Sequence, residues 1–153
     1  MGIASAARLM WLPKGAKVSF QLSYDVLYEY DLNKSGITLE VALRSGGLQE
    51  RQWAKFDSGS SFCIFQREVG ERLGLEIESE LEDWVSTPLG LMRVFGHELL
   101  LETLGITFEA VVYFAAHHGL PRNVLGRSGW MQRLKLGVID YEGKLYAGTY
   151  DSW

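Results

Sequence analysis

The residue with the clearest potential for chemistry is Asp57, which stands in the sequence Phe56-Asp57-Ser58-Gly59-Ser60-Ser61. A carboxylate that lies beside a second carboxylate can act as a base toward water while its neighbour acts as an acid. Gly59 would let the backbone turn tightly beneath the carboxylate and leave its N–H near the acid. A match this short also occurs by chance, so its surroundings decide what it means.

A second element lies further along the chain, in Val124-Leu125-Gly126-Arg127. Its two apolar residues and glycine precede a predicted short helix. The Asp57 turn, in the same way, follows a predicted strand and precedes the apolar run Phe62-Cys63-Ile64-Phe65. The two elements and the strands predicted between them favour a catalytic role for Asp57 over a plain turn.

With these two elements, the sequence resembles the retropepsin-like aspartic proteases, the single-domain relatives of retroviral proteases, which include bacterial members. The resemblance covers about Val41 to Tyr146. It implies that the Asp57 loop packs beside Val124, Leu125 and Gly126 in a psi-shaped arrangement. It also implies a hairpin flap that closes over substrate, with the flap and substrate-binding residues Thr87, Pro88, Leu89, Gly90 and Leu91.

The resemblance also suggests roles for the neighbours of Asp57. Ser58 would reach across a dimer axis to hold the opposing loop, and Ser60 would hydrogen-bond the outer oxygen of the carboxylate. Arg127 matches an arginine that pairs in retroviral enzymes with an acidic residue, but Ser61 occupies that position here. The usual interface ion pair is therefore expected to be missing or rebuilt. The flap, which holds Pro88 and few glycines, is expected to be stiffer.

One chain supplies only half of such a site. No other aspartate is followed by Ser or Thr and then Gly, and the chain is too short for a duplicated, two-lobed enzyme. A twofold homodimer would place Asp57 beside its symmetry mate. The predicted function is therefore an aspartic endopeptidase that hydrolyses extended peptide or protein substrates. The alternative is a non-catalytic module that keeps the fold for dimerisation or peptide binding.

Composition excludes several other classes. The net charge is -4 and Lys and Arg are scattered, which disfavours nucleic acid and membrane partners. The single cysteine, Cys63, cannot form an internal disulfide, and this suits the cytoplasm. His117 and His118 lack neighbouring ligands at metal-binding spacing, so no metal is expected. The predicted chemistry needs no cofactor.

Period-two patterns predict a mainly all-β fold, which the resemblance makes a retropepsin-like acid protease barrel with one or two short helices. Even positions from Val18 to Tyr30 are apolar or aromatic, and odd positions from Ile37 to Leu43 repeat the pattern, so we expect a long hairpin. Further strands are expected at 53–56, 85–95, 99–101 and 106–116, with another pair around the turn Glu142-Gly143. Short helices are expected after Phe65 and after Gly126.

The length of 153 residues with 47% hydrophobic residues fits one compact domain. Residues 1–15 match neither the helical nor the strand period and are predicted to form a flexible N-terminal arm. Residues 16–153 are predicted to form the single protease-like domain. The acidic stretch Glu76 to Asp83 is interpreted as a solvated loop.

Overall fold

The computed structural model describes residues 7–150, and β-strands dominate it. The larger of two sheets has seven strands in the spatial order β2-β3-β8-β4-β7-β6-β5. These strands are β2 (Thr38–Ser45), β3 (Leu48–Phe56), β4 (Ile64–Phe65), β5 (Glu82–Thr87), β6 (Gly90–Thr103), β7 (Ile106–Ala115) and β8 (Asn123–Leu125). The predicted all-β class is thus confirmed.

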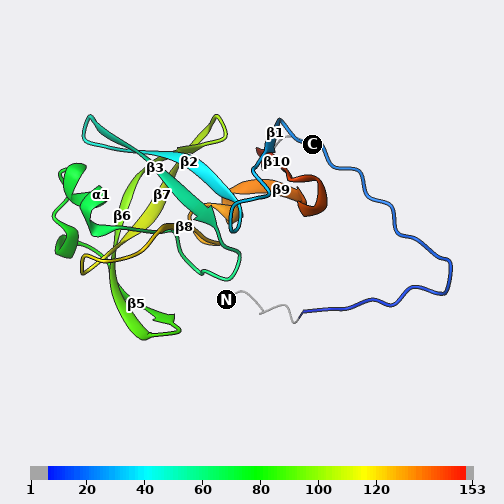
Figure 1. The fold of residues 1–153 in the computed structure, drawn as a ribbon, viewed down its shortest axis with the longest axis horizontal. Helices are drawn as coiled ribbons and strands as arrows, with labels where there is room; N and C mark the ends of the chain where they lie inside the picture. The colour runs from blue at the N-terminus through cyan, green and yellow to red at the C-terminus, as the bar shows by residue number, and fades with distance from the viewer. Residues whose placement is uncertain (1–6, 151–153) are drawn as a thin grey trace.

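Strand β6 closes the larger sheet into a barrel. Its C-terminal part pairs with β2, for example Leu101 with Leu43, so that the first strand of the sheet meets the last but one and leaves β5 at an open edge. Its N-terminal part pairs instead with β5, and Ser86 lies opposite Leu91. The sequence had suggested separate strands before and after residue 97, but β6 is continuous. The β5–β6 hairpin therefore projects from the barrel, as Figure 1 shows.

The smaller sheet pairs the first strand of the chain with the last two. It consists of β1 (Val26–Glu29), β10 (Lys144–Thr149) and β9 (Leu134–Ile139), all antiparallel. The predicted hairpin between 18–30 and 37–43 is wrong, because β1 pairs with β10 while β2 pairs with β3. The predicted first strand is also too long, since only Val26–Glu29 pairs.

The N-terminal segment before β1 runs as an extended chain away from the barrel (Figure 1). Val18, Phe20 and Leu22 alternate like strand residues, yet their side chains are 52%, 87% and 47% exposed. Alternation fits a half-buried strand, but burial requires a partner surface, and none covers these residues among 7–150. Residues 1–6 of the predicted N-terminal arm lie outside the residues that the structure describes.

Helical structure is sparse among the described residues. Helix α1 (Arg67–Arg72) follows β4 and packs near β7, as the spacing of Phe65, Val69 and Leu73 predicts. The second expected helix is only a 3-10 turn, η2 (Met131–Arg133), and leads directly into β9. Two further 3-10 turns are η1 (Ile77–Ser79) and η3 (Asp140–Glu142). Within residues 7–150, no helix has the length and apolar character needed to span a membrane.

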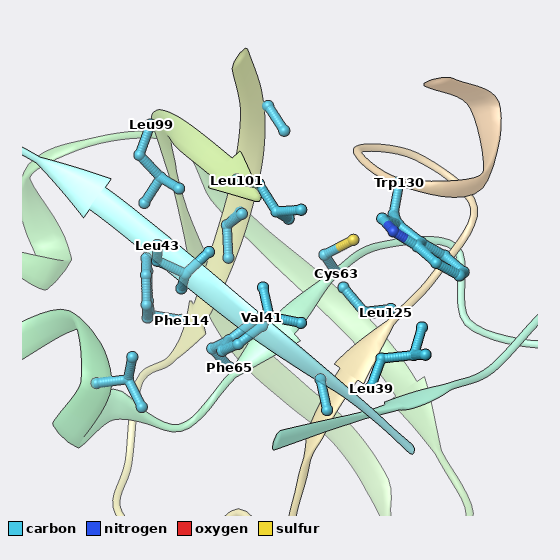
Figure 2. Close-up of a cluster of buried hydrophobic side chains, with 14 of the residues drawn as sticks. Leu39, Val41, Leu43, Cys63, Phe65, Leu99, Leu101, Phe114, Leu125 and Trp130 are labelled. Atoms are coloured by element: carbon cyan, nitrogen blue, oxygen red, sulfur yellow. The ribbon is translucent and has the colours of Figure 1, made fainter. Parts of the chain in front are cut away.

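The barrel interior holds the main hydrophobic core. Alternate residues of β2 point inward and meet side chains from β4, β6 and β7, as Figure 2 shows. Fully buried members include Leu39, Val41, Leu43, Phe65, Leu101 and Phe114. This core fixes the strand ends that carry the site described below.

Leu101→Ala is expected to lower the free energy of unfolding by about 3 kcal/mol, because it leaves a cavity in the closed barrel. Its neighbour Leu100 points to the other face and is 39% exposed, against 0% for Leu101. Leu100→Ala should therefore cost under about 1 kcal/mol. Urea unfolding of both variants measures the difference, and equal losses would contradict the assigned strand face.

Candidate active site

Asp57 begins the loop that leaves the end of β3. Strand β3 runs parallel to β8, with Phe56 opposite Leu125. The N–H of Asp57 continues this ladder by donating to the carbonyl of Leu125 at 2.9 Å. The first residue of the loop is therefore held by the pairing of two strands that lie far apart in the sequence, as the sequence analysis expected.

Gly126 lies directly against the other side of the same loop. A Cβ at this position would stand 2.2 Å from the carbonyl oxygen of Phe62 and 2.6 Å from that of Ser60. Only glycine allows two backbones to approach so closely. The N–H of Arg127 donates to Ser60 O, and that of Ser128 to Ser61 O, both at 2.9 Å. The two sequence elements form one hydrogen-bonded unit.

The carboxylate of Asp57 is exposed, and one of its oxygens is fixed. Oδ1 accepts the N–H of Gly59 at 2.9 Å, the contact that the Asp-Ser-Gly sequence predicts. The hydroxyl of Ser60 donates to the carbonyl of Phe62 at 2.7 Å rather than to the carboxylate, so the predicted bond from Ser60 is wrong. Ser60 supports the loop backbone instead.

Two further predicted residues, Ser58 and Arg127, are exposed. Ser58 is exposed, and the cross-axis contact predicted for it stays a prediction. Arg127 holds the loop through its backbone N–H, while its exposed side chain forms no ion pair within residues 7–150. Ser61, four positions after Asp57, carries no charge and so offers Arg127 no acidic partner there.

A groove of about 570 Å³ separates the Asp57 loop from the β5–β6 hairpin. The loop side contributes Asp57, Gly59 and Ser60, together with Ile64 and Val124. The hairpin side contributes a run from Trp84 to Pro88, with Met92. A carboxylate therefore faces a mostly apolar channel that an extended chain can enter.

A second, larger hollow of about 960 Å³ continues the groove from Asp57 along the hairpin tip. All five residues predicted for the hairpin line it: Thr87, Pro88, Leu89, Gly90 and Leu91. The tip itself has a two-residue loop, and Leu89 at its end is fully exposed. The structure thus brings the predicted hairpin to the same groove as Asp57.

Cys63 is not a candidate nucleophile. Its side chain is completely buried, and burial raises the pKa of its thiol to about 12, so the thiol stays protonated at neutral pH. Within residues 7–150, no three His, Cys, Asp or Glu side chains are grouped so as to hold a metal ion. Asp57 remains the group in the groove best placed for acid–base work.

The sequence analysis missed three residues beside the groove. Lys55 and Arg122 line its larger hollow, and each stands two positions before a predicted site residue, Asp57 or Val124. Asn123 is 4% exposed. Its Oδ1 accepts the N–H of Gln66 at 2.8 Å, and its Nδ2 donates to Trp53 O at 3.1 Å. In the sequence, Lys55 and Arg122 are ordinary charged residues that no local pattern marks.

Comparison with known proteins relates this fold to aspartic proteases. No protein-family model matches the chain, and no curated protein matches it. Among solved structures, it is similar to a retropepsin-like aspartic protease from Rickettsia conorii, with a TM-score of 0.59 and 13% identity over 85% of this chain and 98% of that one.

A second similar structure is EIAV protease complexed with the inhibitor HBY-793. The TM-score is 0.52 and the identity 17%, over 65% of this chain and 88% of that one. Identities this low relate folds and leave the activity to be argued from the site. With its closed barrel, its projecting hairpin and its paired loop elements, this chain has the retropepsin-like fold.

Proposed function

We propose that this protein is an aspartic endopeptidase that acts as a homodimer, with one Asp57 carboxylate from each subunit. The observation that carries the proposal is the exposed carboxylate of Asp57, fixed at the groove on a loop locked to Gly126. The printed names of the two similar structures describe proteases, which supports this reading. A lone carboxylate is half of an acid–base pair, so the second copy completes the site.

The chemistry follows from two close carboxylates that share one proton. The charged carboxylate takes a proton from water as the water oxygen bonds to the peptide carbonyl carbon. The protonated carboxyl donates its proton to the carbonyl oxygen, and a tetrahedral diol forms. In the second step, a carboxyl proton moves to the amide nitrogen, and one hydroxyl of the diol returns a proton to the other carboxylate. The C–N bond then breaks to give an acid and an amine.

The β5–β6 hairpin acts as the flap in this proposal. Strand β5 is an edge strand of the larger sheet, and the hairpin tip overlies the groove from the side opposite Asp57. An extended peptide can lie beneath the hairpin as an added strand, with main-chain hydrogen bonds for affinity and pockets for alternate side chains. Pro88 at the tip restricts the backbone, which makes this flap stiffer than a glycine-rich one.

One observation favours a second candidate, a non-catalytic dimerisation or peptide-binding module. Arg127 is exposed beside the loop and forms no ion pair with any carboxylate of residues 7–150, and position 61 holds a serine. A dimer held without that ion pair could keep the groove and lose the close approach of the carboxylates. Cleavage distinguishes the two candidates.

The wild-type protein is expected to cleave an unbiased peptide library, and its specific activity should fall on dilution over about three decades of concentration as the shared site dissociates. Pepstatin should inhibit cleavage. It should also reduce dissociation of the dimer on dilution, because it binds only the assembled site. Mass spectrometry of the library and sedimentation of the same samples measure both effects.

Two outcomes decide against the proposal. Activity in a strictly monomeric protein would exclude the shared site with one aspartate per chain. A stable dimer that cleaves no peptide at any pH tested would favour the binding module.

A further inference from the structure

The larger hollow of the groove is unusually basic for a chain whose net charge is -4. Three Lys or Arg residues and two histidines line it, and Asp57 is its only acidic lining residue. A neighbouring hollow of about 460 Å³ shares Lys55 and Arg122 and is lined by no carboxylate. A local excess of positive charge lies beside the proposed catalytic carboxylate.

Two members of this basic lining are already compensated. Arg93 Nε lies 2.8 Å from Glu82 Oε1, and His118 Nδ1 lies 2.9 Å from Glu68 Oε1. Lys55 and Arg122 differ, because neither forms an ion pair with a carboxylate in the part of the chain that the structure describes. Among the Lys and Arg residues of the lining, these two are therefore the ones available to an anionic ligand.

Lys55 and Arg122 line the same two hollows. Lys55 lies opposite Val124 in the parallel β3–β8 ladder, and Arg122 directly precedes the first residue of β8. The aliphatic part of the Lys55 side chain passes over Gly36. A Cβ at position 36 would stand 2.3 Å from Cε of Lys55. That glycine leaves room for the lysine to lie along the surface.

The loop that carries Arg122 is pinned on both sides. The side chain of Gln66 donates to Leu120 O at 2.8 Å, and buried Asn123 bonds both Gln66 N and Trp53 O. These contacts fix the backbone around Arg122 before any ligand arrives. Preorganised charge loses less entropy on binding than charge on a mobile loop.

We infer that Lys55 and Arg122 form a subsite that selects substrates with an acidic side chain, Asp or Glu, near the scissile bond. The inference rests on the proposed function, since it takes the groove as the place where a peptide lies. A carboxylate there would neutralise two neighbouring cations that repel one another. Leu91, Met92 and Leu120 line the same hollow and suit apolar residues on either side of the acidic one.

The test is a binding measurement that does not depend on cleavage. The probes are ten-residue peptides, acetylated and amidated, with a central Leu-Phe pair, and one Glu is moved through the flanking positions. A matched set has Gln in place of Glu. A third set has Gln and a free C-terminal carboxylate in place of the amide, and it tests whether the chain end of a peptide is the true ligand. Fluorescence anisotropy with Asp57→Asn protein measures each affinity.

At one or two positions, the Glu peptide is expected to bind about fivefold more tightly than its Gln match, as two partly exposed charge contacts allow. The preference should shrink at high salt and vanish when Lys55→Gln and Arg122→Gln are added. The charge-matched pair Lys17→Gln and Arg51→Gln, which lies outside both basic hollows, should preserve it.

Equal affinity for Glu and Gln at every position would overturn the subsite, as would no detectable binding of any Glu peptide. A preference for Glu peptides that survives Lys55→Gln and Arg122→Gln would also overturn the subsite. So would tighter binding of the peptides with a free C-terminal carboxylate alone. Wild-type cleavage of the same peptides is scored separately. A Glu preference in binding without any cleavage contradicts the peptidase proposal and leaves the acidic subsite standing.

Discussion

Asp57→Asn is expected to reduce peptide cleavage by about 10³-fold or more, because both carboxylates of the dimeric site disappear together. Asparagine retains a side-chain oxygen that can accept the N–H of Gly59, so the loop should keep its shape. The side chain is also exposed, so the free energy of unfolding should change by less than about 0.5 kcal/mol. Cleavage rates and urea unfolding of the two proteins check this expectation.

Asp31→Asn is a closely matched control for that variant. Asp31 is also exposed, and its Oδ1 accepts the N–H of Asn33 at 2.9 Å, the same contact two residues ahead that Asp57 makes. It lies in the loop between β1 and β2 and lines none of the hollows described above. Asp31→Asn should leave cleavage unchanged, and equal activity of wild type and Asp57→Asn would remove Asp57 from the mechanism.

Gly126→Ala should produce the second large effect, through geometry rather than charge. Its Cβ would overlap the carbonyl oxygens of Phe62 and Ser60, which are backbone atoms and cannot rotate away. The Asp57 loop must shift, so we expect cleavage to fall by about 10²-fold or more, since small misplacements of catalytic groups cost that much. Overpacking should also lower the free energy of unfolding by about 2 kcal/mol.

Loss of stability alone must be separated from displacement of the loop. Leu101→Ala is expected to destabilise the barrel to a similar degree, and Leu101 lies in the core outside the groove. At a temperature where both variants are folded by circular dichroism, Leu101→Ala should retain cleavage while Gly126→Ala loses it. Comparable activity per folded molecule would show that the close approach at Gly126 does not position Asp57.

Strand β2 and the β5–β6 hairpin were predictable from the sequence, whereas the short strands β4 and β8 were not. Leu39, Val41 and Leu43 alternate with more polar residues, and all three are fully buried. Period-two alternation reports a strand with one buried face, since successive side chains point to opposite sides. The β5–β6 hairpin was predictable as well, because Pro88 and Gly90 mark a turn between two strand-like runs.

The pairing of the strands was less predictable. Nothing local in Val26–Glu29 indicates that it pairs with β10 rather than with β2, because alternation specifies a face and not a partner. The same limit explains the error at Val18, Phe20 and Leu22, which alternate well yet remain exposed. A strand forms only where another strand supplies hydrogen bonds and a surface to cover.

Some residues of the candidate site were predictable from the sequence and others were not. Asp57 and Gly126 were found because their short motifs carry distinctive residue types, whereas Lys55 and Arg122 are ordinary charged residues in the sequence. They line the same hollow because β3 pairs with β8, which brings together two segments that are far apart in the sequence. Proximity created by such long-range pairing leaves no local pattern.

The sequence by itself therefore determined the chemical group, a carboxylate on a glycine turn, and the mainly β character of the chain. Only the tertiary structure decided which backbone holds that carboxylate, what lies across the groove from it and which cations stand beside it. The physical reason is that residue type and period are properties of neighbouring residues. A site is made by hydrogen bonds and packing between segments that are distant along the chain.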